Sequence, residues 1–256
     1  MIRKIYLLFI LLFLGVMLVP AGFLLWACVT PFDKRGVVIF QYARLWAFCL
    51  IHMNLFWRVK ISGIDNVDIT KSYIMMSNHQ GMYDIPLLYY VPLHFKWVAK
   101  HEVLRMPIVG WVLWMQHGIA IRRGDPKSAQ KMLHQGTQFL SRGTSIMIFP
   151  EGTRSKTGQV NKFMPGAFLM AVKAECPILP IVIEGAKDVV GKKGRGHQFF
   201  IKILPPISAQ EVASSRAKDM ALKLENIIRD AHRQMAPEYY QPNAQEQAEP
   251  IKQADK

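Results

Sequence analysis

Cysteine is scarce in this chain of 256 residues, and the little present excludes two architectures. Cys28, Cys49 and Cys176 are widely separated and stand in apolar surroundings. They form neither the paired framework of a disulfide-stabilised fold nor the ligand spacing of a metal site. We therefore expect buried thiols in a reducing compartment, and no metal site.

Acidic residues are also few: 18 Asp and Glu stand against 32 Lys and Arg, which gives a formal net charge of +14. So basic a chain needs an anionic partner, such as nucleic acid, anionic lipid, or a phosphorylated or acidic substrate. Nucleic acid is disfavoured, because the basic residues are not interleaved with exposed aromatic residues in a recognisable module. The length allows one large domain with a substantial core plus appendages.

The N-terminus is apolar over a long stretch. Residues Ile5–Thr30 can cross a bilayer as one helix, although Pro20 and Gly22 also allow a kinked or re-entrant one. A cleaved signal peptide is disfavoured, since the run is too long and no clean small-x-small site follows it. A second apolar and aromatic segment, Val37–Trp57, is expected to pack on the first helix at the membrane interface. Residues 1–57 thus form a predicted two-helix membrane anchor, whose orientation the flanking charges do not fix.

Short strands then alternate with helices and show no internal repeat, a pattern typical of a mostly parallel sheet with helices packed on it. We predict an α/β fold: a mostly parallel twisted sheet flanked by helices over residues 58–236, the catalytic domain, followed by a disordered tail over 237–256. The expected strands are Trp57–Ser62, Ser72–Met76, Lys96–Ala99, Gly118–Arg122, Thr144–Phe149, Ile178–Glu184 and Phe199–Leu204. Three helices are expected. The first spans residues 125–143 and has Asp125 as its N-cap, and the second is Pro165–Glu175. The third follows a Ser208–Glu211 capping box and continues to Met235.

The stretch Met76–Pro86, MSNHQGMYDIP, follows a predicted buried strand and holds the first candidate catalytic residues. His79 suits general-base work because its charge changes most readily near neutral pH. A loop of four intervening residues lets Asp84 reach the ring and hold it in one tautomer. No Ser or Cys nucleophile stands obviously beside this pair, so the simplest interpretation is activation of a hydroxyl of the substrate.

Basic groups end several other predicted strands. FPEGTRS, residues Phe149–Ser155, presents a planar guanidinium suited to a phosphate or carboxylate, and GIAIRR, residues Gly118–Arg123, ends in two arginines. Lys100 closes a further strand-like run. Each of these alone is better explained by a solvated charge on a turn, as is the basic loop Gly191–Gly196, whose alternative role is a docking patch. Together with His79, the three strand-end groups lie where open α/β sheets place their sites.

Four blocks of the sequence resemble the glycerolipid acyltransferase family. NHQGMYD is similar to its NHxxxxD signature, and FPEGTRS matches its most specific block. GIAIRR resembles the block ending in a substrate-binding arginine, with Arg122 where an acidic residue is often found, and PILPIVI, Pro177–Ile183, is similar to the fourth block. The blocks occur in family order over residues 70–185, and the pattern is most similar to bacterial enzymes that acylate 1-acylglycerol-3-phosphate, which also carry a short N-terminal membrane motif.

The resemblance implies that His79 is the base and Asp84 its orienting partner. The implied reaction transfers an acyl chain from acyl-CoA or acyl carrier protein to the free hydroxyl of lysophosphatidic acid and gives phosphatidic acid, with no cofactor. The implied location is the bacterial cytoplasmic (inner) membrane, with the catalytic domain facing the cytoplasm and in contact with membrane phospholipid. The implied substrate-binding residues are Arg123, Glu151, Gly152, Thr153 and Arg154, with Lys100 as a further candidate.

Three alternatives stay open on the sequence. In the first, the enzyme carries out the same acyl transfer, but the acceptor is another lysolipid or glycerol-3-phosphate. In the second, His79 activates water, as in a hydrolase or thioesterase. In the third, the chain is a non-catalytic membrane protein that binds anionic lipid. Neither the oligomeric state nor the preferred acyl-chain length follows from the sequence.

Overall fold

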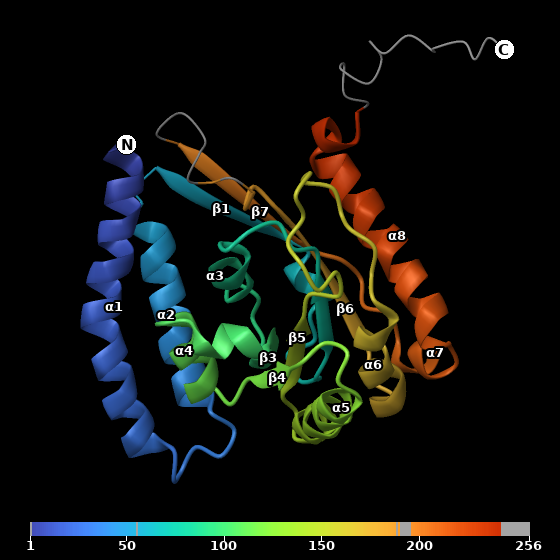
Figure 1. Cartoon of the computed structure of the whole chain (residues 1–256). Coiled ribbons are helices and arrows are strands. Elements are labelled where there is room, and N and C mark those ends of the chain that lie inside the picture. The colour runs from blue at the N-terminus through green and yellow to red at the C-terminus, as the bar shows by residue number, and fades with distance from the viewer. Residues whose placement is uncertain (1, 55, 188, 190–195, 242–256) are drawn as a thin grey trace, which may run out of the picture.

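A seven-stranded sheet forms the centre of the computed structural model, which describes residues 2–54, 56–187, 189 and 196–241 (Figure 1). The strand order is β1-β7-β6-β2-β5-β3-β4. All neighbouring strands are parallel except β6 and β7, so β1 and β7 run opposite to the other five. The predicted mostly parallel α/β fold is therefore confirmed. The strands are β1 (Trp57–Ser62), β2 (Ile74–Ser77), β3 (Phe95–Lys100), β4 (Ile119–Ile121), β5 (Ser145–Ile148), β6 (Ile178–Glu184) and β7 (His197–Ile203).

Helices cover both faces of this sheet. Successive residues of a strand point to opposite faces, so Met75 of β2 packs into one core, while Ile74 and Met76 pack into the other. The first core is completed by α2 (Val37–His52), α3 (Asp84–Leu88) and α4 (Val109–Met115), and the second by α5 (Pro126–Ser141), α6 (Leu169–Ala174), α7 (Ala209–Ala213) and α8 (Ala217–Met235). Short 3-10 helices, η1 (Ile64–Asn66), η2 (His101–Arg105), η3 (Pro165–Ala167) and η4 (Pro237–Tyr240), lie between or after these elements. Burial of both faces explains why β2, β5 and β6 are apolar apart from residues at their ends.

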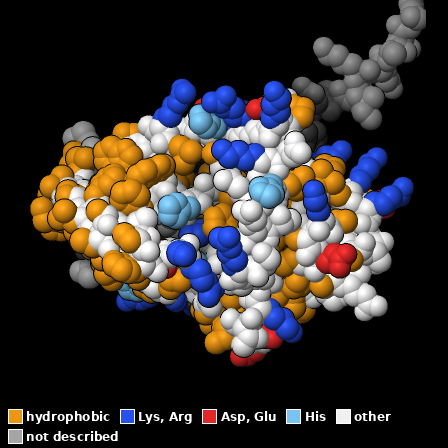
Figure 2. All heavy atoms as spheres, turned by 90° about the horizontal axis from the view of Figure 1, so that it is seen from below, with side chains coloured by type: hydrophobic (Ala, Val, Ile, Leu, Met, Phe, Trp, Pro, Cys, Tyr) orange, Lys and Arg blue, Asp and Glu red, His pale blue; other side chains and the backbone are white. Residues whose placement is uncertain are grey.

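The N-terminal helix α1 (Ile2–Val29) is one continuous helix that passes through Pro20. Its window Leu12–Val29 has a mean hydropathy of 2.3, and only 22% of that window is buried, so it is long and apolar enough to cross a membrane. Large apolar side chains such as Phe9 and Leu24 are exposed, at 60% and 71%. Figure 2 shows hydrophobic side chains gathered at the end of the molecule where α1 lies, and Lys and Arg side chains over the rest of that face. The apolar helix is as predicted, and its crossing of a bilayer stays a prediction.

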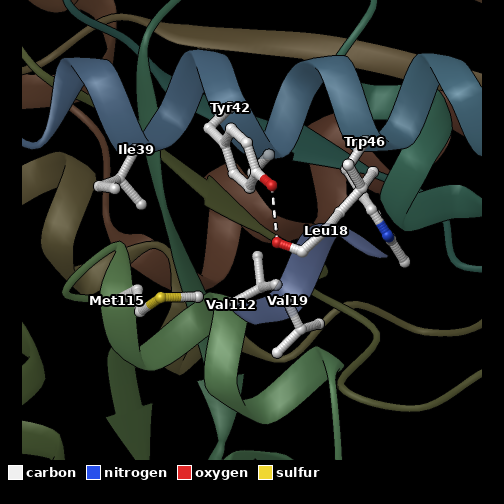
Figure 3. A pocket seen from close by; sticks show the side chains of 8 residues that line it. Leu18, Val19, Ile39, Tyr42, Trp46, Val112 and Met115 are labelled. Atoms are coloured by element: carbon white, nitrogen blue, oxygen red, sulfur yellow. Dashed lines mark hydrogen bonds between the residues drawn. The ribbon is translucent and has the colours of Figure 1, made fainter. Parts of the chain in front are cut away.

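The second helix, α2, packs on α1 as expected, but it is also part of the main core. Phe40, Ala43 and Ala47 on its inner side are buried against the sheet. On its other side, the Tyr42 hydroxyl donates a hydrogen bond of 2.6 Å to the Leu18 carbonyl of α1 (Figure 3). The inner face of α2 thus covers the sheet, and the position of this helix at a membrane interface stays a prediction. A cavity of about 10 Å³ between α1, α2 and α4 is too small for a substrate.

Two predictions near the C-terminus need correction. The helix expected behind Ser208 is divided into α7 and α8. Ser208 Oγ accepts from the Glu211 amide at 3.2 Å, as the capping box predicts. The hydroxyls of Ser214 and Ser215 then donate to the Glu211 carbonyl, and Arg216 is extended (ψ 143°), which ends the first helix.

The tail predicted to be disordered from residue 237 begins with an ordered turn, η4. The Tyr240 hydroxyl lies 2.9 Å from His232 Nδ1 and accepts from the Val160 amide at 3.2 Å, so two distant segments hold this turn in place. Residues 242–256 lie outside the described residues, as do Lys192, Lys193 and Arg195 of the basic loop.

Candidate active site

The candidate site lies where β2 and β5 end side by side. These strands are parallel neighbours, and β2 also pairs in parallel with β6, so their carboxyl ends share one edge of the sheet. The loop after β2 carries His79, and the loop after β5 carries the FPEGTRS sequence. The sheet therefore brings two motifs, about seventy residues apart, to one place, as expected for an open α/β sheet.

His79 and Asp84 meet as the sequence predicts. His79 Nδ1 lies 2.6 Å from Asp84 Oδ2, and the same oxygen accepts from the backbone amides of Gln80 at 2.6 Å and Gly81 at 2.9 Å. The Asp84 side chain is fully buried at the start of α3. Three donors converging on one carboxylate oxygen hold it firmly in place.

The ring of His79 is held in one orientation. It stacks on Phe149, with ring centroids 4.0 Å apart and an interplanar angle of 11°. A carboxylate at Nδ1 assigns the proton to that nitrogen, which leaves a lone pair on Nε2. Nε2 has no hydrogen-bond partner among the described residues, and the side chain is 14% exposed. The arrangement can accept a proton at Nε2 and stabilise the resulting imidazolium through Asp84.

Glu151 joins the two loops. Its Oε1 accepts from the His79 amide at 2.7 Å and its Oε2 from the Asn161 amide at 3.0 Å, while the His79 carbonyl accepts from the Ser155 amide at 2.8 Å. Burial raises the pKa of Glu151 to about 7, and the nearby Asp84 charge adds to this. The resemblance implied contact with substrate, which stays a prediction, because in the structure both carboxyl oxygens are taken up by backbone amides. Its geometry is that of a bridge between loops.

Arg123 lies against the FPEGTRS loop. Gly152 has a positive φ of 66°, which favours glycine, and a Cβ there would lie 2.8 Å from Arg123 Nη2 and displace it. Arg122 points elsewhere, with Nη2 3.2 Å from His101 Nε2. The two adjacent arginines, which follow the end of β4, therefore diverge.

The remaining predicted residues are exposed. Thr153 and Arg154 directly precede Ser155, whose amide bonds to the His79 carbonyl, so their backbone lies beside the histidine. Lys100 at the end of β3 pairs with Glu102 at 3.4 Å. Contacts between the described residues do not bring Lys100 to the two loops. The site thus unites His79 and Asp84 with Arg123 and residues 151–154.

Three supporting residues escaped sequence reasoning. Asn78 locks the His79 loop to β6, because its Nδ2 donates to the Ile183 carbonyl at 2.9 Å and its Oδ1 accepts from the Ile183 amide at 2.8 Å. Phe149 supplies the stacking surface, and the amide of Gln80 helps to hold Asp84. Adjacency to His79 was the one available signal for Asn78 and Gln80, and Phe149 had none, since the partners of Asn78 and Phe149 are distant in sequence.

Comparison with known proteins gives consistent results. A family model described as Acyltransferase matches residues 58–184. The chloroplastic 1-acyl-sn-glycerol-3-phosphate acyltransferase of Arabidopsis thaliana is 33% identical over 155 residues, which are 60% of this chain and 43% of that protein. The 1-acyl-sn-glycerol-3-phosphate acyltransferase alpha of Ovis aries is 30% identical over 207 residues, which are 78% of this chain and 68% of that protein. This chain thus spans less than half the length of the Arabidopsis relative.

A solved structure is similar over almost the whole chain. The crystal structure of the 1-acyl-sn-glycerophosphate acyltransferase PlsC from Thermotoga maritima aligns with a TM-score of 0.61 and 24% identity. The alignment covers 91% of this chain and 97% of that one. At this level of identity the likeness shows a shared fold.

Proposed function

This chain belongs to the acyltransferase family, and on that premise we propose that it acylates 1-acylglycerol-3-phosphate to give phosphatidic acid. The observation that carries the proposal is the His79–Asp84 pair, with 2.6 Å between Nδ1 and Oδ2 and with Nε2 left to accept a proton. The names of the relatives from Arabidopsis thaliana and Ovis aries support the acceptor.

The chemistry is direct acyl transfer. His79 Nε2 removes the proton from the free hydroxyl of the acceptor as its oxygen attacks the thioester carbonyl of the donor. The tetrahedral intermediate collapses, the carbon–sulfur bond breaks, and the imidazolium returns its proton to the leaving thiolate. Asp84 stabilises the imidazolium, and Phe149 keeps the ring from rotating.

The acceptor phosphate is held by the basic groups at the same edge. Arg123 contributes a guanidinium beside Gly152, and Arg154 stands one residue before the Ser155 amide that bonds to His79. Guanidinium groups form bidentate, charge-assisted hydrogen bonds with phosphate. Fixing the phosphate aims the hydroxyl at the thioester, a positioning effect that lowers the entropic part of the barrier.

The donor is acyl-CoA or an acyl carrier protein thioester, both anionic and so matched to the positive chain. The apolar helix α1 holds the enzyme at the membrane in which the acceptor lies. On this proposal the enzyme works at the cytoplasmic face of a bacterial inner membrane.

The test uses the purified full chain with labelled acyl donors and a panel of lysolipids, and the products are identified by mass. We expect phosphatidic acid as the main product with wild-type protein and none with His79→Ala, while the variant stays folded and membrane-associated. Acyl transfer by a folded His79→Ala variant would refute the proposed base. Free fatty acid formed without an acceptor would indicate a thioesterase instead.

A further inference from the structure

A second buried polar cluster lies beside the His79 loop and takes no part in the proposed chemistry. It joins Gln80 to Glu184 at the end of β6, to His232 near the end of α8, and to Tyr240 of η4. His232 is completely buried and Glu184 is 7% exposed. Burying ionisable groups is costly unless they are paired, so the cluster needs a reason.

The hydrogen bonds of Gln80 fix its amide. Its Oε1 accepts from the Ala186 amide at 3.2 Å, which directs Nε2 to Glu184 Oε2 at 2.6 Å. His232 Nε2 lies 2.9 Å from the same oxygen. Burial by itself raises the pKa of Glu184, but the hydrogen bonds from His232 and Gln80 bring it below its ordinary value. Glu184 is therefore a carboxylate that accepts from both side chains.

A His232 proton on Nε2, which donates to Glu184, also satisfies the other polar groups of the cluster. With its proton on Nε2, His232 accepts at Nδ1 from the Tyr240 hydroxyl, 2.9 Å away. The Tyr240 oxygen accepts in turn from the Val160 amide. The contact of 3.0 Å between Gln80 Nε2 and His232 Nε2 follows because both donate to one oxygen. A fully satisfied buried network of this kind is rigid.

Gln80 connects this network to the site. Its backbone amide donates to Asp84 Oδ2 at 2.6 Å, the oxygen that also receives His79 Nδ1. Any shift of Gln80 therefore moves the carboxylate that orients the catalytic ring. We infer that the Gln80 side chain, Glu184 and His232 are positioning residues, through which α8 sets the geometry of the His79–Asp84 pair. This inference rests on the proposed role of His79 as the base.

The first test replaces His232 with Phe, which keeps a ring of similar size without nitrogen. We expect kcat for acyl transfer to fall about 10- to 100-fold, the cost of a small misplacement of catalytic groups. Since the pair does not bind the substrates' distal parts, KM for both substrates should stay within about twofold. His232→Gln, whose amide can still donate to Glu184, should recover most of kcat.

The matched control is Glu225→Gln on the same helix. Glu225 is also 7% exposed, accepts from the Phe163 amide at 2.7 Å and pairs with Arg229, but does not touch the cluster. This variant loosens α8 without disturbing Gln80, so kcat should stay close to wild type. The inference fails if Glu225→Gln lowers kcat as much as His232→Phe does, or if His232→Phe leaves kcat unchanged.

A spectroscopic measurement separates this inference from the proposed function. The His79 ring N–H that donates to Asp84 should give a downfield proton signal, identified by its loss in Asp84→Asn. We expect this signal to shift or disappear in His232→Phe and to persist in Glu225→Gln. An unchanged signal in His232→Phe overturns the inference. A wild-type protein with the signal but without acyl transfer overturns the proposed function alone.

Discussion

Replacement of Glu151 by Gln should change how stability depends on pH. The Glu151 carboxyl is 5% exposed, and burial raises its pKa from 4.5 to about 7. Between these values the folded protein keeps a proton that the unfolded chain releases. The free energy of unfolding contributed by this group is therefore fully present below pH 4.5 and declines as pH rises to about 7.

The size of the effect follows from the shift. A difference of two and a half pH units, at 1.36 kcal/mol per unit, gives about 3 kcal/mol. Glutamine does not titrate, so the stability of Glu151→Gln should gain about 3 kcal/mol relative to wild type between pH 4.5 and pH 7. The assay is urea unfolding of both proteins in the same detergent over pH 4–8. If the free energies of unfolding of the two proteins, plotted against pH, stay parallel within about 1 kcal/mol, the burial argument is refuted.

The same substitution should reduce activity despite the gain in stability. The amide keeps one acceptor but loses the second, so it cannot bind the amides of both His79 and Asn161. The loop carrying Arg154 then separates from His79, and kcat should fall about 10- to 100-fold. A carboxylate that costs stability and is needed for geometry is the pattern expected at a functional site.

Three further outcomes are expected. Arg123→Ala should raise KM for the acceptor about 10- to 100-fold through loss of a charge-assisted hydrogen bond, whereas Arg122→Ala, on the diverging side chain, should leave it unchanged; equal effects would contradict the assignment. Gly152→Ala should raise the same KM, since the new Cβ would lie 2.8 Å from Arg123 Nη2 and displace the guanidinium; steady-state kinetics decide this. Lys96 is buried with no hydrogen-bond partner among the described residues, and burial lowers its pKa to about 8. Stability of the wild type should therefore rise between pH 8 and 10.5, by about 3 kcal/mol relative to Lys96→Met, and identical pH curves for the two proteins would exclude this.

The helical and strand segments were largely predictable from local patterns. Continuous apolar runs gave the central strands, and Asp125 before Pro126 gave the start of α5, where its side chain accepts from the Lys127 amide at 3.0 Å. The split between α7 and α8 was not predictable from local patterns, because it depends on two serine hydroxyls that donate to the Glu211 carbonyl. Nor was the ordered start of the tail, which is held by residues far away in the chain.

By itself the sequence determined the α/β class, the apolar first helix, and the residue types of the site, because periodicity and motif spacing are local. Only the tertiary structure decided what each residue does there. It made Glu151 a bridge between loops and α2 a part of the core. It placed Gln80 against Glu184 and His232, which lie 104 and 152 residues further along the chain. Such contacts depend on strand order and on the packing of α8, which no local pattern encodes.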